Sequence, residues 1–170
     1  MAEDHVDNLL QRLDAAGAQL DLEVEGIVDR VSHINKRVHA ALKETLSTYG
    51  ITPEDWSMMT TLRLRPPGRS TTPGALARDF DLTSGAMTSR LDRLEQLGFV
   101  RRLPDPDDRR AVRVEMTDEG RAAWDAAIEV QGRKEAFFAS ALTKSEQRTL
   151  NDLLRKLTLA FEATREAPTP

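Results

Sequence analysis

The residues most suited to chemistry form one short run, and their types favour nucleic-acid binding. Thr83 begins the run Thr-Ser-Gly-Ala-Met-Thr-Ser-Arg, which combines small polar side chains with a glycine and an arginine. On a helix, small side chains permit close approach to base-pair edges, while arginine reaches phosphates or guanine. An ordinary capped surface helix is the alternative, because serine and threonine are common at any helix N-terminus. The residues that we predict to contact DNA in and beside this run are Arg78, Ser84, Gly85, Thr88, Ser89, Arg90 and Arg93.

A second group of basic side chains follows at a predicted turn. Asp108, Arg109 and Arg110 stand near its tip, and further arginines flank it on both sides. A narrow minor groove concentrates negative potential and attracts an inserted arginine. We therefore predict that Arg110 enters the minor groove beside Arg109, with Asp108 orienting the guanidinium through a bidentate pair. The alternative is a solvated turn whose own salt bridges contribute about 0–1 kcal/mol each.

The distribution of charge supports the DNA-binding prediction better than the total charge does. The chain of 170 residues has a net charge of −4. Residues 63–113, however, hold 11 basic and 7 acidic side chains, a balance of +4, between flanks of −6 and −2. A phosphate-binding face needs local positive potential rather than a basic molecule.

Several other classes of function lack the residues that they require. With no cysteine, the chain has no disulfide, thiol nucleophile or cysteine-ligated metal, which suits a reducing cytoplasm. His5, His33 and His39 are the three histidines, and none forms an i, i+4 pair with another. No glycine-rich nucleotide loop or nucleophile elbow occurs. We predict no enzyme activity, no cofactor and no metal, and, without a run of about 20 apolar residues, no membrane span.

These residues must be positioned by helices and one hairpin. Apolar side chains at steps of three and four predict helices over 5–20 and 22–49, with Gly17 interrupting the first and Gly50 ending the second. The other predicted elements are helices over 52–65, 72–80 and 83–98, strands over 99–103 and 112–116, and two helices that begin at Thr117 and Thr143. The fold class is therefore mainly α with a small β-hairpin wing.

This order of elements is typical of a winged helix-turn-helix protein. We predict a DNA-binding lobe at 51–117, dimerisation helices at 1–50 and 118–165, and a flexible tail at 166–170. The terminal helices carry more apolar surface than one small lobe can cover, which predicts a homodimer with an interface of about 2,000 Å² or more.

Four motifs between Leu82 and Gly120 carry a family resemblance. They read D-R-L-E, G-F-V-R-R, D-P-D-D-R-R and T-D-E-G along the chain. Together they resemble the MarR family of transcription regulators. The resemblance implies an obligate homodimer on a pseudo-palindromic operator in double-stranded DNA, most often a repressor that a small aromatic or phenolic anion releases. The alternative function is a protein-interaction module whose winged lobe does not bind DNA, which the acidic net charge favours.

The added N-terminal helix, His39 and Trp56 resemble the urate-responsive branch of that family. Arg90 and Arg102 match its two ligand arginines, but no tryptophan stands in the first helix and Ser57 replaces an aspartate. The resemblance therefore implies an aromatic anion other than urate. The predicted ligand-binding residues are Trp56, Met59, Arg90 and Arg102.

Each of these assignments has a structural alternative. Trp56 can belong to the core, Arg90 can contact phosphate, and Arg102 can pair with an acid of its own lobe. His39 lies where the branch has a histidine near its symmetry mate, so it is predicted to sense pH at the dimer pivot. A plain interface histidine is the alternative.

Overall fold

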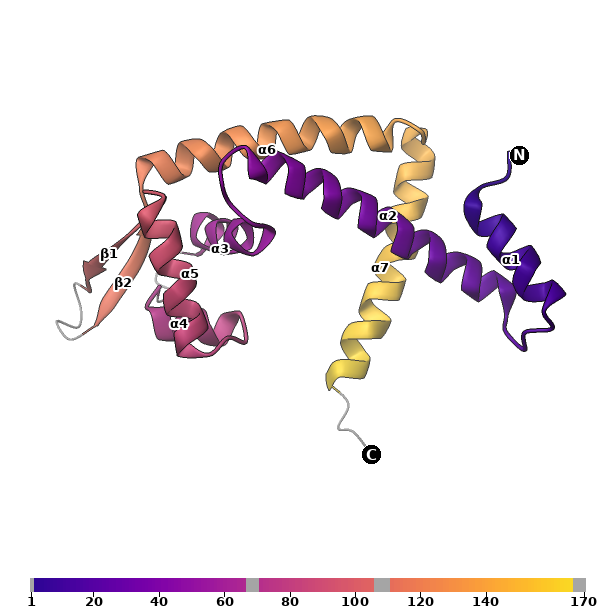
Figure 1. Ribbon diagram of the computed structural model, residues 1–170, viewed down its shortest axis with the longest axis horizontal. Helices are drawn as coiled ribbons and strands as arrows, with labels where there is room; N and C mark the ends of the chain where they lie inside the picture. Colours follow the sequence, from indigo (N-terminus) through magenta and orange to yellow (C-terminus); the bar gives the residue numbers. More distant parts are fainter. Residues whose placement is uncertain (1, 67–70, 106–110, 167–170) are drawn as a thin grey trace. The chain divides into compact units, whose positions relative to one another are not determined.

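The computed structural model of the protein describes residues 2–66, 71–105 and 111–166, and it is mainly helical with one hairpin (Figure 1). This confirms the predicted fold class. The chain divides into two compact units, the first ending at Gln131 and the second beginning at Gly132. Its elements are α1 (His5–Ala15), α2 (Leu22–Ser47), α3 (Pro53–Leu64), α4 (Pro73–Asp79), α5 (Ser84–Gln96), β1 (Val100–Pro104), β2 (Val112–Met116), α6 (Asp118–Ala139) and α7 (Lys144–Glu166).

Most helix boundaries follow from local capping. The hydroxyl of Thr52 accepts a hydrogen bond from the Asp55 N–H, and the Asp55 carboxylate accepts one from the Thr52 N–H, so α3 begins with a complete capping box. Thr83, not Ser84, caps α5, and its hydroxyl accepts a hydrogen bond from the Ala86 N–H at 3.2 Å. Gly50, with a φ of 67°, takes the left-handed conformation after α2.

Several predicted boundaries differ by one to five residues. The helices predicted over 22–49 and 83–98 end at Ser47 and Gln96. The first helix ends at Ala15 rather than near residue 20, because Gly17 adopts a φ of 68° and turns the chain. The first strand is Val100–Pro104 rather than 99–103. Phe99 instead joins α5 to the strand, because its N–H donates to the Leu94 carbonyl and its own carbonyl accepts from the Thr117 N–H.

The hairpin packs one face against the core of the first unit. Its strands are antiparallel, with Val100 opposite Met116 and Arg102 opposite Val114. Val100, Val114 and Met116 are all buried, as expected for side chains on one face of a hairpin, while Val112 at the far end of β2 is exposed. The backbone N–H of Val114 also donates to the Thr71 carbonyl at 3.1 Å, so β2 is tied to the segment before α4.

A single hydrophobic core supports the whole winged helix-turn-helix. It combines the C-terminal end of α2 with α3, α4, α5, the hairpin and the first half of α6. The core side chains with 0% exposure are Leu46, Met58, Met59, Leu76, Met87, Leu91, Leu94 and Val114. Packing is closest at Gly120, where a Cβ atom would lie 2.1 Å from the Phe99 carbonyl oxygen. Glycine is therefore required where α6 crosses the start of β1.

Most of α2, before the end that joins the core, leaves apolar side chains uncovered in the single chain, and so does α7. On α2, the exposed residues are Val24, Ile27, Val28, Val31 and Ile34. On α7, within the second unit, they are Leu150, Leu153, Leu154, Leu157, Leu159 and Phe161. In the described part of the chain, no helix is long and apolar enough to cross a membrane.

Candidate nucleic-acid interface

The turn between α4 and α5 fixes the helix-turn-helix. The chain leaves α4 through Asp81, which has a φ of 51° and is the one non-glycine residue with positive φ among those the structure describes. The Leu82 N–H then donates back to the Ala77 carbonyl at 2.9 Å. An aspartate tolerates this left-handed conformation better than most L-residues do, so the turn needs no glycine.

The outward face of α5 is polar and uncovered. Ser84, Thr88 and Ser89 are exposed, while Met87 and Leu91 on the opposite face are completely buried. Within the described residues, the three hydroxyl groups make no side-chain hydrogen bond. They are therefore free to bind groups outside the chain, such as base edges or phosphates.

Gly85 is not explained by packing within the chain. A Cβ atom added to it would meet no other atom within 4 Å, in contrast to Gly120. Glycine in a helix costs roughly 0.5–1 kcal/mol relative to alanine. Its presence on the outward face of α5 is consistent with a close approach by something outside the chain.

The predicted phosphate ligands differ in how far the protein already uses them. Arg78 is exposed on α4. Arg93, in contrast, places its Nε 2.9 Å from the carboxylate of Asp55, which is only 2% exposed, and donates to the Gly50 carbonyl at 2.6 Å. Arg93 therefore neutralises a buried carboxylate and joins α5 to the start of α3.

Arg90 lies near the N-terminal turn of α3. Its side chain is half-buried, and its charge is one of the influences on Glu54. Hydrogen bonds from the Glu54 N–H and the Thr52 hydroxyl lower the pKa of the Glu54 carboxyl, and Arg90 lowers it further. The guanidinium of Arg90 thus has Glu54 as an acidic neighbour at long range, and among the described residues it forms no ion pair like that of Arg93 with Asp55.

Arg102 pairs with acids of its own lobe. Its guanidinium lies 2.6 Å from the carboxylate of Asp92 and 2.5 Å from that of Glu95, and its backbone N–H donates to Glu95. Burial lowers the pKa of the Arg102 guanidinium, but the hydrogen bonds to Asp92 and Glu95 outweigh it and raise that pKa above its ordinary value. The structure thus contains the arrangement that the sequence left as the alternative to a ligand role.

Trp56 is partly buried against the hydrophobic core, and Met59 belongs to that core. Trp56 stacks on Trp124, with ring centroids 5.6 Å apart and planes 11° from parallel. The indole N–H of Trp124 donates to the Thr60 hydroxyl at 3.0 Å, and Arg63 lies over the same ring. Met59 has 0% exposure, so a ligand can reach it only if the core opens. The ligand-site prediction remains a prediction.

The remaining predicted site residues are not tested by these contacts. Asp108, Arg109 and Arg110 lie outside the described residues. His39 is exposed on α2 in the single chain. Its predicted approach to the His39 of a second chain therefore stays a prediction. No group of three or more metal-binding side chains occurs among the described residues.

Sequence reasoning missed contacts between residues that are distant in the chain. The Trp56–Trp124 stack and the Arg93–Asp55 pair are two of them. For Arg102 a signal was present, since Asp92 and Glu95 are three residues apart and share one face of a helix. That spacing identifies an acidic pair but not the arginine that it binds.

Comparison with known proteins decides the family. A family model described as "MarR family" matches residues 51–112. The multiple antibiotic resistance protein MarR of Escherichia coli (strain K12) is 32% identical over 125 residues, which are 73% of this chain and 85% of that protein. The chain belongs to the MarR family of transcription regulators.

Two further relatives extend the similarity. The HTH-type transcriptional regulator PecS of Dickeya dadantii (strain 3937) is 29% identical over 89% of this chain and 92% of its own length. A mutant of E. coli MarR crystallised with operator DNA superposes with a TM-score of 0.62 at 30% identity, covering 82% of this chain and 99% of that one. The similarity to PecS thus includes parts of the chain well outside residues 51–112.

Proposed function

We propose that this MarR-family chain is a dimeric transcription regulator that binds double-stranded operator DNA through α5 and the hairpin. The observation that carries the proposal is the outward face of α5. This face exposes three hydroxyl groups and Gly85, while the opposite face of the helix is completely buried in the core. Bound operator DNA in the structure of E. coli MarR supports it by similarity.

The proposed contacts divide by chemistry. Ser84, Gly85, Thr88 and Ser89 approach base edges in the major groove, and Arg90 reaches guanine or phosphate there. Arg78 and Arg93 bind phosphates, which position a protein without specifying sequence. At the wing, Arg110 enters the minor groove with Asp108 and Arg109 beside it.

The proposed dimer uses the helices at 1–50 and 118–165, around the lobe at 51–117. The apolar rows of α2 and α7 support it, because isolated monomers rarely expose such continuous apolar surface. Pairing would place two recognition helices about 34–36 Å apart, which demands half-sites one helical turn apart. We further propose that His39 lies near its symmetry mate, where protonation near pH 6.5 would weaken the interface.

The proposed mode of regulation is repression relieved by an aromatic or phenolic anion other than urate. Arg90 and Arg102 would hold the anion, and Trp56 and Met59 would cover its ring. Arg102 can do so only by exchanging Asp92 and Glu95 for the ligand, because its guanidinium is already bound by both. The ligand must therefore favour a rearranged conformation over the DNA-binding one.

The test of DNA binding is the affinity for promoter duplexes measured against salt. A DNA-binding dimer loses affinity steeply with salt through counterion release, and Arg110→Ala reduces the slope by about one. Thr88→Ala changes the preferred sequence with little effect on the slope. Binding that is absent, or insensitive to salt, would support the interaction-module alternative.

The test of the effector is a titration of aromatic anions, urate included, against the protein–operator complex. A non-urate anion is expected to release DNA, and Arg102→Ala is expected to blunt its effect. Release by low-micromolar urate contradicts the assigned specificity, and a full response of Arg102→Ala removes that residue from the site.

A further inference from the structure

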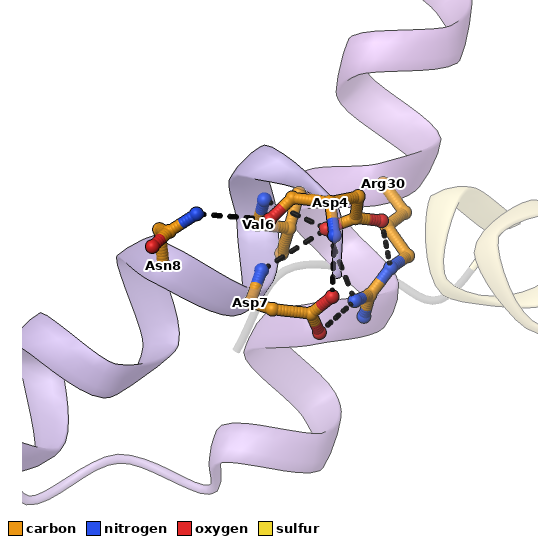
Figure 2. Close-up of polar contacts among 5 residues, drawn as sticks. All are labelled: Asp4, Val6, Asp7, Asn8 and Arg30. Carbon is orange, nitrogen blue, oxygen red and sulfur yellow. Dashed lines mark hydrogen bonds and ion pairs between the residues drawn. The ribbon is translucent and has the colours of Figure 1, made fainter. Parts of the chain in front are cut away.

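The first two helices are joined by a charged clamp. Arg30 of α2 places its Nε 2.9 Å from the carboxylate of Asp4 and its terminal nitrogen 2.5 Å from that of Asp7 (Figure 2). The Asp4 carboxylate also accepts hydrogen bonds from the Val6 and Asp7 N–H groups, which cap α1. The first turn of α1 is therefore held against one turn of α2.

Two histidines meet beside this clamp. His5 follows Asp4 directly, and His33 stands three residues after Arg30, on the same side of α2. Their ring centroids are 4.0 Å apart, with planes tilted by 48°. Both residues are exposed to solvent.

We propose that His5 and His33 form a two-imidazole site for a divalent late transition-metal ion, which ties α1 to α2. Imidazole is a preferred ligand of nickel, copper and zinc. Metal–nitrogen bonds of about 2.0–2.1 Å require the two ligating nitrogens to lie within about 4.2 Å of each other. Two rings whose centroids are 4.0 Å apart can meet this requirement if each side chain rotates to turn one nitrogen towards a shared point. Water completes the coordination, because no third metal-binding side chain of the described residues joins the group.

The clamp provides the preorganisation that a two-ligand site needs. Free imidazoles on separate helices would lose conformational freedom on binding one ion, and that loss lowers affinity. Here Arg30, Asp4 and Asp7 already hold the two backbones in place. The site lies outside residues 51–112, which the family model matches, and does not depend on DNA binding.

The test is calorimetric titration of the untagged full chain with Ni²⁺, with Mg²⁺ as the oxygen-preferring control ion. The wild type is expected to bind one Ni²⁺ per chain and no Mg²⁺. His5→Gln and His33→Gln are each expected to weaken binding at least tenfold, while His39→Gln, elsewhere on α2, binds like the wild type. Arg30→Gln keeps both imidazoles but loosens α1, and is expected to weaken binding severalfold.

Other outcomes overturn the proposal. If His33→Gln binds Ni²⁺ as the wild type does, the pair is not the site. One ion per two chains, lost in His39→Gln, would assign the metal to a pair of His39 residues across a dimer instead. Amide hydrogen exchange gives an independent readout, since Ni²⁺ should slow exchange in α1 of the wild type and not of His33→Gln.

Discussion

The outward faces of α5 and α2 are both uncovered in the single chain, but their chemistry differs. On α5 the exposed groups include the hydroxyls of Ser84, Thr88 and Ser89, which water can satisfy in the absence of a partner. On α2 they include Ile27 and Val31, which are 53% and 44% exposed. Exposed apolar surface costs about 25 cal/mol per Å², so the α2 face favours a permanent protein partner. The α5 face suits a partner that binds and leaves.

The strongest test of this difference places charge on the apolar face. Ile27→Glu combined with Val31→Glu is expected to produce monomers in analytical ultracentrifugation. Burying two unpaired carboxylates in an interface has a large unfavourable free energy. The affinity for duplex DNA should fall about 100-fold or more, since a monomer binds one half-site without the second lobe that the dimer supplies.

The control for that experiment is Lys36→Glu, which helical spacing places away from the apolar row of α2. It should remain dimeric. Fluorescence of the stacked Trp56–Trp124 pair reports whether the lobe stays folded. A double variant that remains dimeric would show that α2 is not the interface.

The polar face of α5 is tested by replacing Gly85 with alanine. This change is expected to increase the stability of the fold but to decrease the affinity for operator DNA. Gly85→Ala is expected to raise the free energy of unfolding by about 0.5–1 kcal/mol, because nothing obstructs the new Cβ atom. It should nevertheless lower operator affinity about tenfold, or about 1.4 kcal/mol, if DNA approaches this backbone closely.

Gly132→Ala is the matched control for that variant. It also lies within a helix, α6, and its added Cβ also meets no atom within 4 Å. The same gain in stability is expected, with operator affinity unchanged. Equal affinity for both variants would mean that Gly85 does not face DNA closely.

A smaller effect on stability is expected to distinguish an arginine that stabilises the fold from one that only binds DNA. Arg93→Ala leaves the buried Asp55 carboxylate without its cation, which should cost roughly 1–3 kcal/mol in chemical denaturation. Arg78→Ala should change stability by less than about 0.5 kcal/mol. If both bind phosphate, each variant lowers the salt slope by about one. An unchanged slope for Arg93→Ala would assign that residue to the fold alone.

The smallest effect concerns the clamp between α1 and α2. The hydrogen bond from Arg30, together with those from the Asp7 and Val6 N–H groups, lowers the pKa of the Asp4 carboxyl from 3.8 to about 2. Since the folded pKa lies below the unfolded one, this contribution to stability is complete above about pH 5 and is lost as the pH falls through about 2. Asp4→Asn should therefore increase hydrogen exchange in α1 at pH 5, and the difference from the wild type should be much smaller at pH 2, where about half of the Asp4 carboxyls are protonated. A difference that is undiminished at pH 2 would exclude the carboxylate charge as its source.

Local sequence patterns determined the elements of this protein, because their partners lie within a few residues. Thr52 with Pro53 and Thr143 with Glu146 were identified as helix starts, and the start of α5 was assigned to Thr83 or Ser84. In the structure Thr52, Thr83 and Thr143 cap these helices. The strand β2 was also predicted from the sequence, because apolar and charged side chains alternate along it and successive side chains of a strand point to opposite faces. Gly17 was identified as the interruption of the first helix, although the helix ends two residues before it. The boundary at Phe99 was missed because it depends on a backbone hydrogen bond with the distant Thr117.

Tertiary packing decided which side chains of the candidate site remain available. Arg93 and Asp55 are 38 residues apart, and Arg30 and Asp4 are 26 apart, so no helical or strand period relates them. The sequence also could not distinguish Met59, which is completely buried, from an exposed methionine. A side chain's type sets the chemistry that it can perform, but the packing of distant segments decides whether that group faces the core, another side chain or a partner.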